Sequence, residues 1–183
     1  GGSWVNYVKV ALLRLQFQFK EQMIRGMDMV LTGNIPVAAG LSSSSAVVVA
    51  TAEAAVALNG LDVVPQDFVD LCGEGEWYVG SRGGAGDHAA MKFSRSGEVT
   101  HIGFFPFEVK GRTPFPGGYE LLIANSHIKA QKMTNAKDTF NQRVASYEIG
   151  LVLLRERFPQ LAPRLERLRD LQPKRLGVRP SEL

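Results

Sequence analysis

The stretch GNIPVAAGLSSSSA, residues 33–46, joins a loop of small residues to a long helical pattern. Glycine lets the backbone approach a ligand closely, and serine is favoured at the start of a helix. A helix N-terminus offers unpaired N–H groups and a positive dipole end, which suit phosphate. Serine hydroxyls can also ligate Mg²⁺, a hard cation that prefers oxygen. The stretch is not a Walker A loop. It predicts a phosphate site or, alternatively, a flexible serine-rich loop before a core helix.

The patterns on either side of this stretch predict an α+β protein. Helices are expected over residues 4–19, from the serines to Leu58, and over 65–78, 131–158 and 163–170, because apolar residues recur there at helical spacing. Strands are expected over 28–33, 99–107 and 119–124, with a turn over 113–118 between the last two. Asn59-Gly60 is a C-cap signal for the serine-led helix, and Pro65 suits the first turn of the next one.

A second stretch with chemical potential is EGEWYVGSRGGAGDH, residues 74–88. A carboxylate on a glycine-rich loop near a phosphate site could orient or deprotonate a hydroxyl nucleophile. On the alternative interpretation, Asp87 caps a following helix. Arg82 could pair with Asp87 or with a phosphate. Together, the two stretches suggest phosphoryl transfer from a nucleotide to an alcohol.

Composition and charge exclude several classes of protein. The 183 residues are 45% hydrophobic and 21% charged, which is globular composition, and the single cysteine excludes an intramolecular disulfide. We expect a cytoplasmic protein with no membrane partner, because the sequence has no apolar run of spanning length. The net charge is +3, and residues 151–183 carry eight Arg or Lys against four acids. A basic end without a motif is typical of a solvated helix face, so we expect no nucleic-acid partner.

Motifs along the chain resemble those of galactokinases, within the galactokinase, homoserine kinase, mevalonate kinase and phosphomevalonate kinase (GHMP) superfamily. They are WVNYV at 4–8, like W-x-N-Y-V; residues 33–44, like G-x-[IV]-P-x-G-[AS]-G-L-S-S-S; VGSRGGAGD at 79–87, like V-G-x-x-C-G-I-M-D; and ANS at 124–126 with NQR at 141–143, like I-N-S…Y-N-x-R-R. Ala38 replaces the first inner glycine of the second motif. The resemblance covers roughly four-fifths of the chain. It implies a GHMP-kinase N-terminal domain, which is ribosomal protein S5 domain 2-like.

The resemblance also implies roles for individual residues, with ATP and Mg²⁺ as cofactors and a sugar as substrate. Asp87 is the expected catalytic base or hydroxyl-orienting group. The expected ATP- and phosphate-binding residues are Pro36, Ala39, Gly40, Leu41, Ser42, Ser43, Ser44 and Ser45. The expected substrate contacts are Gly84, Asp87, Arg82 and His88, although a lone histidine beside a functional residue is more often structural.

The magnesium ligands are expected to be a serine and a glutamate. Within the serine run, Ser43 is favoured and Ser44 is next. Counting forward from the serines places the glutamate at Glu76, whereas counting back from the aspartate places it at Gly75. Glycine cannot ligate a metal, so Glu76 is expected and Glu74 is the alternative.

Departures from the family pattern limit what the resemblance implies. Phe140 stands where galactokinases carry a tyrosine that positions the sugar, so galactose itself does not follow from the resemblance. A related sugar, or a sugar acid neutralised by Arg82, is plausible. Neither the G-E-H-x-D-Y segment nor the C-terminal glycine-rich motif of galactokinases occurs in the chain. We therefore expect an internal piece, incomplete at both ends and about half of a two-domain kinase, with Gly1-Gly2-Ser3 as a truncation edge or cloning remnant.

Domain organisation and function follow from the same comparison of motifs. Residues 1–125 are expected to be part of the N-terminal, ATP-binding domain, and residues 126–183 the helical start of the C-terminal domain. The expected function is ATP-dependent phosphorylation of a sugar hydroxyl, by a chain that need not be active alone. The alternative is a catalytically silent, kinase-like sensor of sugar or nucleotide. The sequence leaves the oligomeric state open.

Overall fold

The computed structural model describes residues 3–104, 107–127, 135–179 and 181. The chain divides into two compact units, Gly1–Thr134 and Asn135–Leu183, and each is described by itself. This division falls nine residues after the predicted boundary at 125/126. The assignment of the two parts to kinase domains stays a prediction.

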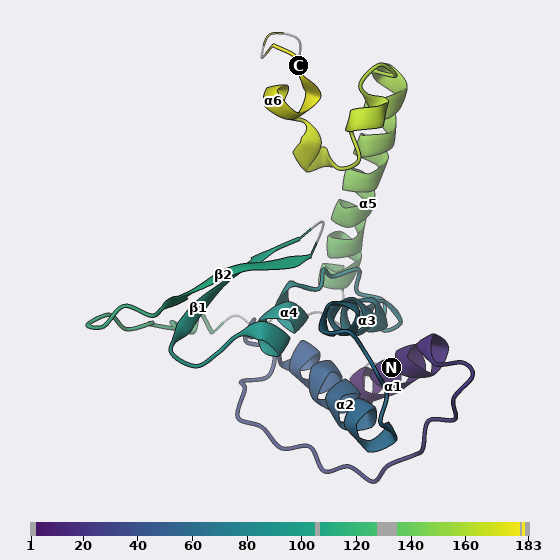
Figure 1. Cartoon of the computed structure of the whole chain (residues 1–183), viewed down its shortest axis with the longest axis vertical. Helices are drawn as coiled ribbons and strands as arrows, with labels where there is room; N and C mark the ends of the chain where they lie inside the picture. Colours follow the sequence, from purple (N-terminus) through teal and green to yellow (C-terminus); the bar gives the residue numbers. More distant parts are fainter. Residues whose placement is uncertain (1–2, 105–106, 128–134, 180, 182–183) are drawn as a thin grey trace. The chain divides into compact units, whose positions relative to one another are not determined.

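Four helices form the body of the first unit (Figure 1). They are α1 (Val5–Gln18), α2 (Ser43–Asn59), α3 (Pro65–Trp77) and α4 (Gly86–Phe93). The predicted caps are confirmed: α2 ends at Gly60, whose left-handed φ of 57° lets its N–H bond back to the helix, and α3 begins at a proline. The helix α4 follows the predicted glycine-rich loop, where sequence reasoning offered a helix only as an alternative.

The core lies where α1, α2 and α3 pack against one another. Its larger members are Leu15, Phe68 and Leu71, each nearly or completely buried. Burying one such side chain contributes about 1.5–3 kcal/mol. The helix α2 presents small residues to this core, which lets its neighbours approach closely. The remaining members of the core are Val10, Ala11, Val48, Val49, Ala52, Ala55, Leu61 and Cys72.

A glycine sets the close packing between α3 and the segment that leads into α4. A Cβ added at Gly73 would lie 2.9 Å from the Cβ of Ala85 and 3.3 Å from its Cα. Real carbon atoms do not pack that closely. Ala85 is the N-cap residue of α4, so the absence of a side chain at position 73 fixes how α4 starts.

A two-stranded antiparallel hairpin follows α4. Strand β1 (Glu98–Gly103) pairs with β2 (Glu108–Pro114), with an irregularity between His101 and Ile102. The predicted strand over 99–107 is therefore shorter than expected, and its residues 105–106 lie outside the described part of the chain. The strand β2 was missed because most of it is exposed on both faces, and a strand without an apolar face shows no alternation.

Two further predicted strands are wrong for this structure. Residues 28–33 show the predicted alternation, with Met29 and Leu31 half-buried while Val30 and Thr32 are exposed, but they form no strand. Residues 119–124 are exposed throughout and irregular. A strand needs a neighbour to pair its N–H and C=O groups, and within the described residues β1 and β2 pair only with each other. Among the described residues, the hairpin of β1 and β2 supplies the β part of the predicted α+β fold.

The second unit consists of a long helix followed by short turns. It contains α5 (Asn135–Arg157), the 3₁₀ turns η1 (Ala162–Arg164) and η2 (Leu168–Asp170), and α6 (Pro173–Leu176). The predicted helix over 131–158 has its residues 131–134 outside the described ranges. The predicted helix over 163–170 is replaced by the two 3₁₀ turns, and the buried residues Leu165 and Leu176 anchor the segment around them.

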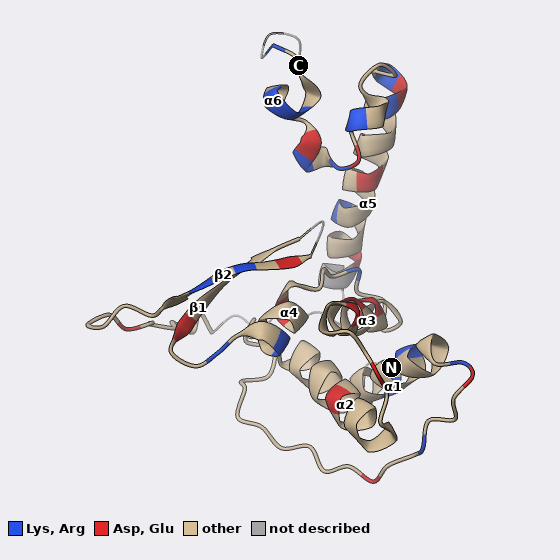
Figure 2. Ribbon diagram, in the orientation of Figure 1, with Lys and Arg blue, Asp and Glu red and all other residues tan. Residues whose placement is uncertain are grey.

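Basic residues recur along the second unit (Figure 2), and several of their side chains bond to its turns. Arg155 Nε donates to the carbonyl of Leu165 at 2.7 Å, and Arg164 Nη1 donates to the carbonyl of Leu176 at 2.7 Å. Arg175 forms an ion pair with Asp170. Part of the positive charge at this end of the sequence is therefore engaged in intramolecular contacts. Within the described residues, no helix is both long and apolar enough to cross a membrane.

Candidate functional site

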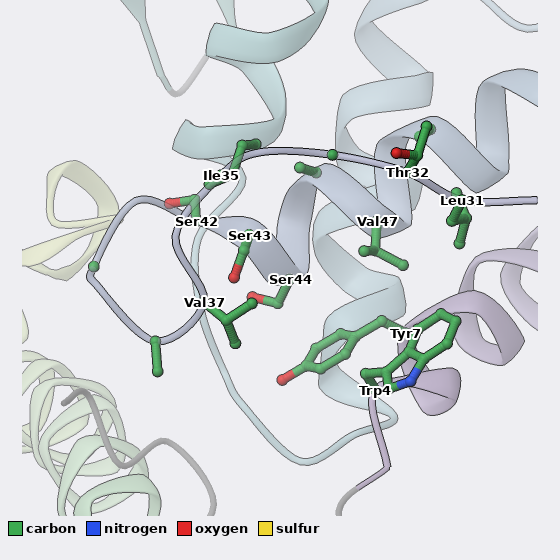
Figure 3. Close-up of a pocket in the computed structure, with 15 residues that line it drawn as sticks. Trp4, Tyr7, Leu31, Thr32, Ile35, Val37, Ser42, Ser43, Ser44 and Val47 are labelled. Atoms are coloured by element: carbon green, nitrogen blue, oxygen red, sulfur yellow. The ribbon is translucent and has the colours of Figure 1, made fainter.

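A pocket of about 560 Å³ opens beside the N-terminus of α2 (Figure 3). The rings of Trp4, the N-cap residue of α1, and of Tyr7 from α1 line one part of it, and Ser42, Ser43 and Ser44 line another. Apolar residues of the loop and of α2 complete the wall: Leu31, Ile35, Val37, Ala38, Ala46, Val47 and Ala50, together with Thr32, Gly33 and Gly40. The pocket therefore joins an aromatic and aliphatic wall to a row of hydroxyl groups.

The predicted phosphate-binding residues divide between this pocket and its surroundings. Gly40 and Ser42 to Ser44 line the pocket. Pro36, Ala39 and Leu41 lie on the same loop and are exposed, but they are not among the pocket's lining residues. Ser45 is buried and turned toward α3 rather than toward the pocket. The four serines thus occupy two different environments.

The loop before α2 has an unusual backbone. Ala38, Gly40 and Ser42 all have left-handed φ values, of 59°, 76° and 56°. This conformation is unfavourable for residues other than glycine, so Ala38 and Ser42 hold local strain of the kind that is typical of functional loops. Ser42 is the N-cap residue of α2, yet no side-chain hydrogen bond caps the helix. The side chain of Ser42 therefore does not cap the first N–H groups of α2.

The helix behind these N–H groups carries almost no charge. Its sequence SSSAVVVATAEAAVALN has Glu53 as the only charged residue, and α2 is nearly all tan in Figure 2. Glu53 is paired with Lys92 of α4. Within α2 itself, no other charged side chain offsets the helix dipole, which is positive at this end and favours an anion.

Glu76 lies beneath the serine run, in contact with α2 and α4. It is 7% exposed, and the buried Ser45 Oγ donates a hydrogen bond of 2.7 Å to its Oε1. His88 Nε2 lies 3.4 Å from the same oxygen. His88 is itself 1% exposed. The structure thus places this predicted substrate contact in the interior, beside Glu76.

Tyr7 reports on the electrostatics of this region. Its pKa is raised above the usual value, first by burial and then by the negative charge of Glu76, while a hydrogen bond with Ser44 acts in the opposite direction. The phenol therefore stays neutral and remains a hydrogen-bonding partner for the serine. Through these interactions, the pocket-lining Ser44 and the buried Glu76 share one neighbour.

Glu74 has a separate role, on the opposite side of α3 from Glu76. Arg14 of α1 donates to Glu74 Oε2 from both Nε and Nη2, at 3.0 and 2.5 Å. This bidentate-type pairing joins α1 to α3. Of the two glutamates considered from the sequence, Glu76 is therefore the one that contacts the serine run.

Asp87 lies exposed in the first turn of α4. The N-cap position is Ala85, without a side-chain cap hydrogen bond, so Asp87 does not serve as the N-cap that the alternative interpretation proposed. Gly84 lies just before this turn and is exposed. The guanidinium of Arg82 stacks on the ring of Trp77, 5.0 Å from its centroid. The loop therefore presents a carboxylate, a glycine and a cation from one short segment.

The donor set near the serine run suits Mg²⁺. Among the residues that the structure describes, no three His, Cys, Asp or Glu side chains cluster as a metal site. Mg²⁺ commonly uses one or two carboxylates together with waters and substrate phosphates. The Glu76 carboxylate with the hydroxyl of Ser43 or Ser44 could supply the protein's share of such a set.

The aromatic wall of the pocket was not predicted as part of the site. Trp4 and Tyr7 were recognised only as members of an apolar helix face and of the motif at residues 4–8. Their spacing of three residues places both rings on one face of α1, and this spacing was the signal available. The inward turn of Ser45 carried no such signal, because four identical residues in a row do not show which one faces the core.

Comparisons with known proteins identify relatives of this chain. Residues 6–95 match the family model for the GHMP kinases N terminal domain. The chain is 28% identical over 170 residues to a galactokinase of Dictyostelium discoideum, covering 92% of this chain and 34% of that protein. It is 31% identical over 159 residues to a galactokinase of Candida parapsilosis, covering 83% and 31%. A Roseiflexus galactokinase is 27% identical over 182 residues, covering 99% and 44%. The chain thus spans 31% to 44% of the length of these relatives.

Proposed function

Because residues 6–95 form a GHMP kinase N-terminal domain, we propose that this chain comes from an ATP-dependent sugar kinase. The observation that carries the proposal is the pocket at the start of α2, in which aromatic residues of α1 face the hydroxyls of Ser42 to Ser44. A flat, apolar wall suits the base of a nucleotide. Helix N–H groups beside it suit the phosphates.

The residues of the site supply complementary parts of phosphoryl transfer. Ser42 to Ser44 and the first N–H groups of α2 hold the phosphates, and Glu76 with Ser43 or Ser44 holds Mg²⁺. When bound, Mg²⁺ neutralises part of the phosphate charge. Asp87 orients a sugar hydroxyl or accepts its proton, the hydroxyl oxygen forms a bond to the γ-phosphorus, and the bond from that phosphorus to the leaving ADP oxygen breaks.

The substrate proposed for this site is a hexose or a hexose derivative. The galactokinase relatives support a sugar. The exposed, cationic Arg82 on the same loop as Asp87 additionally suits a sugar that carries a carboxylate. A panel that contains galactose, other neutral hexoses and hexuronic acids tests this choice.

The test is a coupled assay of ADP formation with ATP, Mg²⁺ and each sugar, with Asp87→Asn as the control variant. Turnover that needs one sugar and falls by about 10²–10⁴-fold in Asp87→Asn supports the proposal. Nucleotide binding without turnover of any sugar favours a catalytically silent sensor. The absence of both binding and turnover refutes the proposal.

A further inference from the structure

A buried histidine with unsatisfied nitrogens lies against the proposed metal ligand. His88 is 1% exposed, and within the described residues neither Nδ1 nor Nε2 has a hydrogen-bond partner. A buried polar group without a partner is unfavourable, and such a group in a native protein calls for an explanation. Its nearest charged neighbour is Glu76, whose Oε1 lies 3.4 Å from His88 Nε2.

The same carboxylate oxygen is approached from two different helices. Ser45 of α2 donates to Glu76 Oε1 at 2.7 Å. The distance from His88 Nε2 of α4 to the same oxygen is 3.4 Å, slightly longer than an ordinary N–H···O bond. Hydrogen bonds in sites without ligand are often long and tighten when the ligand binds. A small shift of either side chain would close this one.

We propose that His88 is a positioning residue for Glu76. With a proton on Nε2, His88 directs its N–H at Glu76 Oε1 already in the free protein, and this 3.4 Å contact shortens to a hydrogen bond when metal and nucleotide bind. His88 and Ser45 together then hold the carboxylate in place beside the serine run. Groups that orient a metal ligand in this way contribute to metal affinity without touching the metal. The inference rests on the proposed function, because it takes Glu76 to be the Mg²⁺ ligand.

The position of His88 in the chain gives this contact a second consequence. His88 follows Asp87 directly in the first turn of α4, with Asp87 exposed and His88 buried. A hydrogen bond from His88 to Glu76 therefore also fixes the turn that presents the proposed catalytic carboxylate. Metal binding at Glu76 and the placement of Asp87 are linked through one side chain.

Two substitutions separate this role from simple packing. His88→Leu fills the interior position with an apolar side chain of moderate size but removes the N–H donor, whereas His88→Gln keeps an N–H donor. The matched control is Thr51→Val on α2, which removes another buried polar atom that has no partner among the described residues. Thr51 does not line the pocket. This control therefore removes a buried hydroxyl group and leaves the residues of the site unchanged.

The readout is binding of ATP, followed by tryptophan fluorescence because Trp4 lines the pocket, at a series of Mg²⁺ concentrations and in EDTA. We expect His88→Leu to need roughly tenfold more Mg²⁺ for half-maximal tightening, with binding in EDTA unchanged. We expect His88→Gln to stay within about twofold of the wild type, and Thr51→Val to match the wild type. Thermal unfolding of each variant shows whether it remains folded.

Three outcomes would overturn the inference. They are an unchanged Mg²⁺ requirement in His88→Leu, a loss of affinity that is equal with and without Mg²⁺ and follows thermal stability, and a failure of His88→Gln to restore the requirement.

A double-mutant cycle of His88→Leu and Glu76→Gln in ligand-free protein tests the contact without nucleotide. We expect a coupling of roughly fivefold or more in the unfolding equilibrium constant. If the wild type binds no ATP, the proposed function is refuted, and this cycle alone judges the contact: additive effects overturn it and coupled effects support it.

Discussion

Replacing Gly73 by alanine tests the close packing between α3 and the start of α4. The new Cβ would lie 2.9 Å from the Cβ of Ala85, although carbon atoms prefer about 3.5–4.0 Å. The two segments must therefore separate by about 0.5–1 Å, and overpacking of this kind costs about 1–3 kcal/mol. Alanine is better than glycine inside a helix by about 0.5–1 kcal/mol. We expect a net loss in the free energy of unfolding that is centred on about 1 kcal/mol and does not exceed about 2.5 kcal/mol.

The same substitution two residues further along α3 is the matched control. A Cβ at Gly75 would meet the carbonyl oxygen of Val10 at 3.5 Å, which is ordinary contact. Gly75→Ala should therefore stabilise the protein by about 0.5–1 kcal/mol. Adding Ala85→Gly to Gly73→Ala removes the clashing methyl group and should recover most of the loss.

The assay is urea unfolding of the full chain, followed by far-ultraviolet circular dichroism. The reasoning is refuted if Gly73→Ala is as stable as Gly75→Ala, or if Ala85→Gly brings no recovery. A displaced Ala85 also moves the first turn of α4, so Gly73→Ala should lower the kcat of the proposed kinase activity, whereas Gly75→Ala should leave it unchanged.

Four further predictions concern the site and the core. Ser45→Ala leaves the buried Glu76 without its 2.7 Å donor and should lower the free energy of unfolding by about 1.5–3 kcal/mol; a loss too small to measure by urea unfolding would contradict the contact. Glu76→Gln should weaken Mg²⁺-dependent ATP binding in calorimetry much more than Glu74→Gln, and equal effects would refute the choice of ligand. Ala38→Gly relieves a left-handed alanine and should raise the urea midpoint, by up to about 1 kcal/mol in stability, whereas a lower midpoint would argue against this loop conformation. Burial, with a smaller effect from Glu53, raises the pKa of Cys72 to about 12; the associated stability is complete below the thiol's ordinary pKa, about 8.5, and is lost as the pH rises toward 12. Unfolding measured from pH 8 to 11 should show this decline, and rapid alkylation of the native thiol at pH 8 would contradict it.

Local sequence signals predicted α1, α2, α3 and the described part of α5, whereas α4 was offered only as an alternative and two 3₁₀ turns replace the helix expected over 163–170. The glycine at position 60 and the proline at position 65 mark helix ends through their own backbone chemistry, and these ends are confirmed. The strands were harder, because a strand depends on a partner elsewhere in the chain. Residues 28–33 keep their alternating burial without pairing, and β2 pairs without any alternation.

The candidate site was predicted in its parts rather than in its arrangement. The serine run was singled out by residue type and spacing, and the two glutamates by the resemblance to galactokinases. Which serine turns inward, and which glutamate meets it, depends on the packing of α2 against α3, and no local pattern encodes that packing. The contact of His88 with Glu76 likewise arises between two helices whose junction is set by Gly73.

The alternation of left-handed residues at positions 38, 40 and 42 restricts how this loop can change during evolution. A β-branched side chain such as valine or isoleucine is strongly disfavoured in this conformation, so substitutions at Ala38 and Ser42 that preserve the loop are confined to glycine, asparagine, aspartate and a few other small residues. The intervening positions, Ala39 and Leu41, face no such limit and are exposed. Mutational tolerance along the loop should therefore rise and fall with every second residue, although every position lies on the surface or close to it.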